Sequence, residues 1–395
     1  MFPRSDLVTK TDMSRRLFVQ ARTELDRAIA RALARFQSKS ALNRSSLDDG
    51  PGFIALKKTR RVIKLSGGDA RKLLQSLLTN DINEMFTSRG MNVNNNNNNN
   101  DDDDDNNEGV DLIESQQSMY AAMLTTKGRV VTDCFVYKWD QGEGRSDGEI
   151  YIDTCSSAKE ELLRQIVRRK LRSAVTVDDC MDEVVVACAP PANGTSKSCT
   201  SALAADPRWF GLGKRGIVSA AKYAKKVAGN DDDDDENEIA YARWRHVNGV
   251  PEGSIELGDR FPAETRLTHL NAVSFTKGCY VGQEPTARAE FQGEVRKGIV
   301  PIVFDETKEV KINGTLISKR DEKEIGKVVA SKGGGVGLAL VRFAKVENVS
   351  EGVSIETVNN FGDDDDVEKK KTFIDCEFGT PHWWSHHQTK QYSKE

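Results

Sequence analysis

The chain has 395 residues, with 57 Lys and Arg against 61 Asp and Glu, and 37 % of it is apolar. This length is enough for about two or three domains. Runs of consecutive Asp at 101–105, 231–235 and 363–366 produce the negative charge. The rest of the chain is mildly basic, which favours a small anionic ligand and argues against nucleic acid. No stretch approaches the roughly 20 apolar residues of a membrane span.

The seven cysteines stand singly at positions 134, 155, 180, 188, 199, 279 and 376. They form no CxxC pair and no spacing typical of zinc. An odd count with irregular spacing predicts free thiols in a reducing compartment.

Residues 1–45 contain eight Arg, and Leu25, Ile29, Leu33 and Phe36 repeat at helical spacing. A basic amphipathic helix of this kind predicts a mitochondrial targeting peptide. A structured N-terminal helix or a polybasic surface helix is the alternative. We expect the folded part to begin near residue 52.

The first half of the chain predicts mixed strands and helices. A strand, a glycine turn and a helix are expected over 61–81, followed by a disordered acidic insertion at 92–109. Two strands around a turn at 126–128 follow, then strands at 148–155 and 183–191 with an amphipathic helix from 157 between them. Without regular βαβ repetition, this order indicates an α+β class with an antiparallel sheet.

A second acidic insertion is predicted at 229–238, before a helix over 238–253 that Gly249 and Pro251 would stop. Short strands with Gly turns after residue 293 predict a small barrel or sandwich. A third acidic insertion is expected at 362–371. The predicted organisation is therefore a region 52–294 of two subdomains, a β-domain 295–384 and a tail 385–395.

The stretch "FTKGCYVGQE", residues 275–284, carries the candidate chemistry. Gly278 and Gly282 allow a tight loop around Cys279, and Lys277 would favour its thiolate. Gln283 and Glu284 offer an amide and a carboxylate that suit a pterin-like ring. Arg288 offers a cation for an anionic tail.

Three other interpretations of this stretch stay open. The cysteine is a buried residue in a glycine-bordered turn, or the chain is a non-catalytic interaction module. A Cys–His enzyme is disfavoured because none of the five His lies in a recognisable protease context.

The sequence "SFTKGCYVGQEPTAR" resembles the KGCYxGQE signature of YgfZ-type proteins, folate-binding relatives of the glycine-cleavage aminomethyltransferase. Segments at 77–81, 168–177, 248–253 and 336–341, with Trp383 and Trp384, resemble the eukaryotic mitochondrial branch of late-acting iron–sulfur cluster assembly factors. The similarity extends from about residue 52 to about residue 384.

The resemblance implies an aminomethyltransferase-like fold of three domains in a ring around a central folate-type channel, with a C-terminal β-barrel. It implies a role in the mitochondrial matrix in the maturation of 4Fe–4S proteins, with A-type iron–sulfur carriers as partners. Tetrahydrofolate is the implied cofactor, and a folate-dependent one-carbon transferase is the alternative function.

The resemblance also implies the site. Cys279 would be the cluster-associated thiol and a shared, transient iron–sulfur ligand. The expected cofactor-binding residues are Lys277, Gly278, Tyr280, Gly282, Gln283, Glu284, Arg288, Asp133 and Asn271.

Two departures from the family pattern disfavour amine transfer. Thr132 stands where the relatives have a first acid before Asp133, and Asn271 replaces another acid, which removes proton acceptors. One cysteine cannot supply the roughly four thiolates of a cluster. We therefore expect a cluster shared with a carrier.

Overall fold

The computed structural model describes residues 54–86, 117–138, 149–180, 182–189, 203–221, 231–292, 295–346, 352–361 and 368–379. They fall into two compact units. The larger unit holds the described residues up to 241 together with 252–295, and the smaller unit holds 242–251 and the residues from 296 onward. Each unit is described by itself. The predicted targeting peptide, the 92–109 insertion and the 385–395 tail lie outside the described residues.

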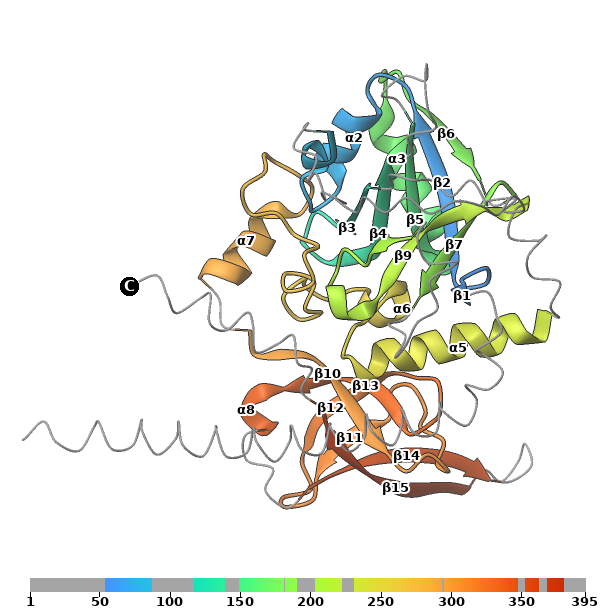
Figure 1. Ribbon diagram of the computed structural model, residues 1–395. Helices are drawn as coiled ribbons and strands as arrows, with labels where there is room; N and C mark the ends of the chain where they lie inside the picture. The colour runs from blue at the N-terminus through green and yellow to red at the C-terminus, as the bar shows by residue number, and fades with distance from the viewer. Residues whose placement is uncertain are drawn as a thin grey trace, which may run out of the picture. The chain divides into compact units, whose positions relative to one another are not determined.

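A five-stranded antiparallel sheet forms the centre of the larger unit, in the order β3-β4-β5-β2-β6 (Figure 1). Its strands are β2 Arg60–Ser66, β3 Gln117–Leu124, β4 Val130–Lys138, β5 Glu149–Cys155 and β6 Thr176–Asp179. The helices are α2 Ala70–Leu77 and α3 Lys159–Lys170, with the short turns η2 Ile82–Phe86 and η3 Ser156–Ala158. The predicted hairpin, strand–turn–helix and helix–strand segments are confirmed.

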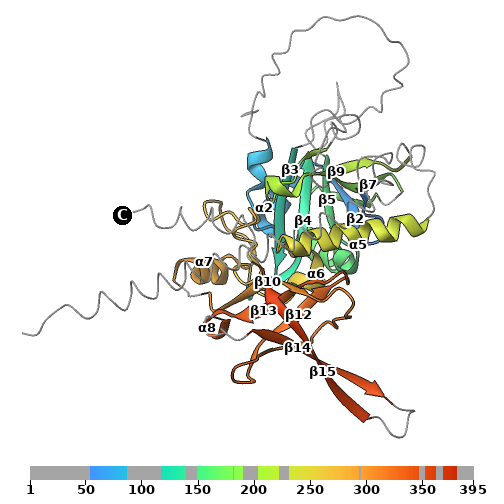
Figure 2. The same cartoon turned by 60° about the horizontal axis from the view of Figure 1, so that its bottom comes forward.

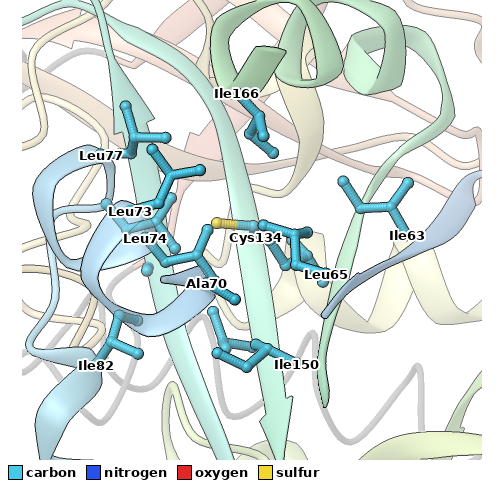
Figure 3. Packing of buried hydrophobic residues seen from close by; sticks show 14 of the residues in the cluster. Ile63, Leu65, Ala70, Leu73, Leu74, Leu77, Ile82, Cys134, Ile150 and Ile166 are labelled. Atoms are coloured by element: carbon cyan, nitrogen blue, oxygen red, sulfur yellow. The ribbon is translucent and has the colours of Figure 1, made fainter. Parts of the chain in front are cut away.

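One face of this sheet forms a hydrophobic core with α2 and α3 (Figure 3). The alternation of side chains along a strand sends Ile63, Cys134 and Ile152 to this face. Leu74 of α2 and Ile166 of α3 cover them and are completely buried. The intervening residues of the strands, which include Arg60, Asp133 and Asp153, face the opposite side.

A second antiparallel sheet covers that opposite side. It has the order β1-β7-β9-β8, with β1 Ile54–Ala55, β7 Val184–Ala189, β8 Ala204–Ala205 and β9 Lys214–Ser219, and the turn η4 Phe210–Leu212 follows β8. Arg215 of β9 reaches Asp153 of β5 with an N–O distance of 2.5 Å. The space between the two sheets is therefore ionic, although a sandwich interior is ordinarily apolar.

The predicted insertion at 229–238 is wrong for most of its length, because helix α5, Asp231–Val247, begins at the Asp run. Carboxylates are favourable in the first turns of a helix, where the backbone dipole is positive. The Glu238 carboxylate also accepts hydrogen bonds from the backbone N–H groups of Lys58 and Thr59. The predicted stop holds, since Gly249 takes a positive φ of 63°. Two further helices follow, α6 Gly253–Leu257 and α7 Gln283–Phe291.

The smaller unit contains a closed barrel, which decides between the two predicted β architectures. Its strands are β10 Lys297–Phe304, β11 Thr315–Ser318, β12 Glu324–Ser331, β13 Val336–Arg342, β14 Val353–Phe361 and β15 Glu368–Phe378, with α8 Phe343–Val346 after β13. Figure 2 shows the β14–β15 hairpin extending from the barrel. The predicted insertion at 362–371 is too long, because β15 already begins at Glu368 and pairs with Phe361.

Among the described residues, no helix is both long enough and apolar enough to cross a membrane.

Candidate functional site

Cys279 is exposed and free, whereas the other cysteines that the structure describes, 134, 155, 180, 188 and 376, are buried. It lies in the loop that leads into α7. Among the described residues, the Cys279 thiol has no hydrogen-bond partner, so nothing in this unit occupies the sulfur. The alternative of a cysteine buried in its turn is therefore wrong.

The end of α2 holds this loop at both sides of the cysteine. Before it, the Thr79 hydroxyl donates to the Ala272 carbonyl at 2.5 Å, and the Ser274 N–H donates to the Thr79 carbonyl at 3.0 Å. After it, the Val281 N–H donates to the Ser76 carbonyl at 3.1 Å. The thiol is thus presented by a loop whose two ends are fixed on one helix terminus.

The Lys277 side chain also fixes the loop on the end of α2. Its side chain is buried, and its ammonium donates to the carbonyls of Gln75, Leu78 and Asn80 at 2.8, 2.7 and 2.6 Å. Burial lowers the pKa of Lys277 to about 8, so the ammonium still carries all three protons at neutral pH. All three N–H donors of this ammonium are used by the carbonyls at the end of α2, so the ammonium donates no hydrogen bond to the thiol.

The two glycines of the loop differ in whether a side chain would fit at their positions. Gly282 has a φ of 82°, and a Cβ there would lie 2.6 Å from the Thr125 carbonyl oxygen, so only glycine fits. At Gly128 in the β3–β4 turn, a Cβ would lie 2.8 Å from the Cβ of Pro285 in α7. Gly278 is open, since a Cβ there would meet nothing within 4 Å. Because Gly278 has no side chain, no atoms project from this position beside the sulfur.

Helix α7 carries the amide, acid and arginine of the motif. Gln283 is its first residue, and Glu284 and Arg288 form an exposed ion pair at 2.7 Å. Arg288 also lines an open hollow of about 460 Å³, together with Phe261, Pro285, Ala289 and Gln292. The carboxylate and guanidinium of the motif therefore engage each other on the surface.

Asp133 belongs to a different place, which we call the buried ionic cluster. Its members are Arg60, Asp133, Asp153, Asp206, Arg208, Arg215, Tyr241 and Glu252, all at most 8 % exposed. Asp153 accepts from Arg60 and Arg215 at 2.5 Å each. Glu252 accepts from Arg208 at 2.6 Å and from the Tyr241 hydroxyl at 2.8 Å.

The three guanidinium groups of the cluster surround one aromatic ring. Arg215, Arg208 and Arg60 lie 3.8, 4.9 and 5.3 Å from the centre of Phe135. An aromatic face attracts cations, and the attraction is strongest where water is excluded. The face of the Phe135 ring therefore stabilises three neighbouring guanidinium groups, and the carboxylates of the cluster neutralise their charges.

Asp133 has no face open to a ligand. Its carboxylate accepts from Arg60 at 3.3 Å, from the Tyr120 hydroxyl at 3.1 Å and from the Gly253 N–H at 3.1 Å. Burial raises the pKa of Asp133, and the charge of Arg60 opposes that shift. Thr132 points to the other face of β4, where its hydroxyl lies 3.2 Å from that of Thr154.

The predicted site residues thus divide into two groups. The residues from Lys277 to Arg288 form the Cys279 loop and the start of α7, while Asp133 lies in the ionic cluster. Asn271 joins the two, because its side-chain amide donates to the backbone carbonyl of Arg208 at 3.2 Å and its backbone carbonyl accepts from the Asn80 side chain at 2.7 Å. Among the predicted cofactor residues, Arg288 lines the hollow on α7.

The sequence interpretation missed most of the ionic cluster. Asp153 follows the apolar residues "IYI" in its strand. Arg60 is the first residue of a strand that contains several buried residues. A charged residue inside an apolar strand requires a buried partner. That signal was present for Asp153, but nothing in the sequence pairs it with Arg215.

Comparisons with known proteins agree with this architecture. Residues 296–386 match the family model described as the CAF17 C-terminal beta-barrel domain. The glycine cleavage system aminomethyltransferase T from Bartonella henselae has a similar structure, with a TM-score of 0.54 and 14 % identity over 84 % of this chain and 86 % of that chain. The chain therefore has an aminomethyltransferase-like fold with a C-terminal barrel.

Curated relatives carry a more specific name. The chain is 30 % identical to the human mitochondrial iron–sulfur cluster assembly factor IBA57, over 75 % of this chain and 80 % of that protein. It is 32 % identical to the Pyricularia oryzae homolog, over 74 % and 72 %. The match to the Mycosarcoma maydis homolog, 31 % identical over 62 % of this chain, spans just over half of that protein, 55 %. The chain belongs to the IBA57 family of mitochondrial iron–sulfur cluster assembly factors.

The ionic cluster predicts unequal costs for two similar substitutions. Asp153→Asn removes the charge that neutralises two buried guanidinium groups, so we expect a loss of about 3–5 kcal/mol in the free energy of unfolding. Asp133→Asn should cost under about 2 kcal/mol, because burial already disfavours the Asp133 charge and the Tyr120 hydroxyl can turn. Urea denaturation measures both, and equal losses would contradict this description of the cluster.

The two loop glycines give a second prediction. Gly282→Ala should lower the free energy of unfolding by about 1–3 kcal/mol, because it places a Cβ against the Thr125 carbonyl at a positive φ. Gly278→Ala is the matched control and should stay within about 0.5 kcal/mol of the parent protein. Thermal unfolding of both variants tests this, and a large loss for Gly278→Ala would show that the space beside it is not open.

Proposed function

We propose that this protein acts in iron–sulfur cluster assembly by presenting Cys279 as a single ligand to a cluster held mainly by a partner. The observation that carries the proposal is the exposed thiol on a loop fixed at both ends. The relatives named as assembly factors support the general role. The maturation of 4Fe–4S proteins in the mitochondrial matrix is the finer form of the same proposal.

The arrangement of ligands supports sharing. Among the described residues, no group of three or more His, Cys, Asp and Glu side chains is placed to hold a metal ion. A cluster needs about four ligands. The remaining thiolates would therefore come from a carrier, and we propose an A-type iron–sulfur carrier as that partner.

The loop contributes geometry to this chemistry. A thiolate that is already positioned loses little conformational freedom when it joins a cluster on another protein. Gly278 leaves room for the partner's chain next to the sulfur, since no Cβ projects there. One bond from this side is also easily replaced when a recipient protein offers its own thiolates.

Amine transfer, the alternative function, receives no support from the geometry of the described residues. Asp133 is engaged by three donors and completely buried, and Thr132 supplies no carboxylate. Tetrahydrofolate binding stays a prediction, and the proposed sharing of a cluster through Cys279 does not require it. Calorimetric titration with tetrahydrofolate tests it, with Arg288→Gln expected to weaken any binding about threefold or more through loss of a cation.

Cys279→Ser tests the proposed function. We expect the variant to fold like the parent protein and to lose at least about tenfold in the yield of a cluster-bridged complex, because a serine hydroxyl is a poor substitute for a thiolate ligand. The protein is mixed with an A-type carrier loaded with cluster, and native mass spectrometry and visible absorption follow the complex.

Thr276→Ser is the matched control, since it changes an exposed residue of the same loop and keeps its hydroxyl. It should behave like the parent protein. If Cys279→Ser formed the complex and the four-iron product in undiminished yield, the cluster would not use this sulfur and the proposed function would be withdrawn.

A further inference from the structure

The C-terminal end of α3 exposes two aliphatic side chains that the fold does not need on the surface. Val167 is 61 % exposed and Leu171, the residue that follows the helix, is 85 % exposed. They are four residues apart, so they lie next to each other on the same side of the helix end. The buried side of the helix is formed by Leu162 and Ile166.

Unpaired cations flank these two side chains. Among the described residues, the side chains of Arg168, Lys170 and Arg172 have no hydrogen-bond or ion-pair partner. The two other arginines of the helix are already engaged, Arg164 by Glu161 and Arg169 by Gln165. The acidic residues of the helix lie in its first turn, about 10 Å away along the axis. Charge is therefore segregated along α3, with the cations at the exposed end.

Helix stability explains only part of this pattern. Cations in the last turn are favourable because the carbonyl end of a helix is negative. That argument does not explain Leu171, which has φ 46° and ψ −110° at a position where glycine is the usual residue. The chain keeps an exposed aliphatic side chain in a conformation that its Cβ disfavours.

We propose that this end of α3, residues 164–172, binds the surface of an anionic phospholipid bilayer. Aliphatic side chains that enter the acyl boundary, with Lys and Arg at the level of the phosphates, are the pattern of interfacial membrane binding. An acidic protein partner is less favoured, because protein contacts centre on aromatic anchors in pockets. The large exposed apolar residues here, among those the structure describes, are both aliphatic.

Hydrogen–deuterium exchange of the full chain with vesicles localises the contact. The probes are vesicles of phosphatidylcholine alone and vesicles with roughly one third phosphatidylglycerol. We expect the peptides covering residues 162–175 to become protected only by the anionic vesicles, and the protection to fall at high salt because ions screen the attraction. This local readout is needed because the basic residues 1–45 would bind vesicles on their own.

Leu171→Gly is the decisive variant. Glycine accepts the positive φ, so the variant should unfold at the same or a higher temperature, while the protection of 162–175 should require at least about fivefold more lipid. Arg172→Gln should also raise the lipid concentration needed for this protection about fivefold. Ile255→Gln, which changes an aliphatic side chain that is 66 % exposed on α6, is the control and should leave the protection unchanged.

Three outcomes would overturn the proposal. These are no protection of 162–175 by anionic vesicles, protection that Leu171→Gly and Arg172→Gln leave intact, and protection by a soluble polyglutamate but not by vesicles. The last outcome would assign this surface to an acidic protein instead.

Discussion

The buried ionic cluster is the interaction on which the larger unit depends. Arg60, Arg208 and Arg215 each contact Phe135, and their carboxylate partners come from β4, β5, the turn after β8 and the start of α6. Charges buried in this way must be paired completely, since one missing partner leaves another uncompensated. The cluster therefore permits only one arrangement of the two sheets, and Asn271 connects that arrangement to the Cys279 loop.

The Cys279 loop uses the same principle on a smaller scale. The last carbonyls of α2 need donors, and the Lys277 ammonium supplies them from the loop itself. A cation that sequence reasoning assigned to the thiol is thus a structural element. The result is a loop that is fixed at both ends and presents a sulfur that makes no hydrogen bond among the described residues.

The sequence predicted the strands, the helix boundaries near glycines and a C-terminal β-domain well, because those depend on local periodicity and turn residues. Local pattern left open whether that domain is a barrel or a sandwich, and only the family resemblance implied the barrel. Sequence reasoning failed where a long-range partner decides the outcome. The run Asp231–Asp235 reads as disordered by composition, yet it starts α5, and Lys58, distant in sequence, pairs with Asp235 at 2.5 Å. Asp133 could be singled out from a family pattern, but its neighbours Arg60 and Glu252 are brought to it only by the fold.

The separation of the sulfur from its support has a practical consequence. The hydrogen bonds that fix the two ends of the loop on α2 come from backbone atoms, Thr79 and Lys277, and Cys279 contributes none of them. Natural variation at this codon would therefore leave expression level, melting temperature and proteolytic resistance untouched. If Cys279 lends its sulfur to a cluster as proposed, screens that rank variants by protein abundance would classify such an allele as harmless, and only a measurement of cluster delivery would reveal the defect.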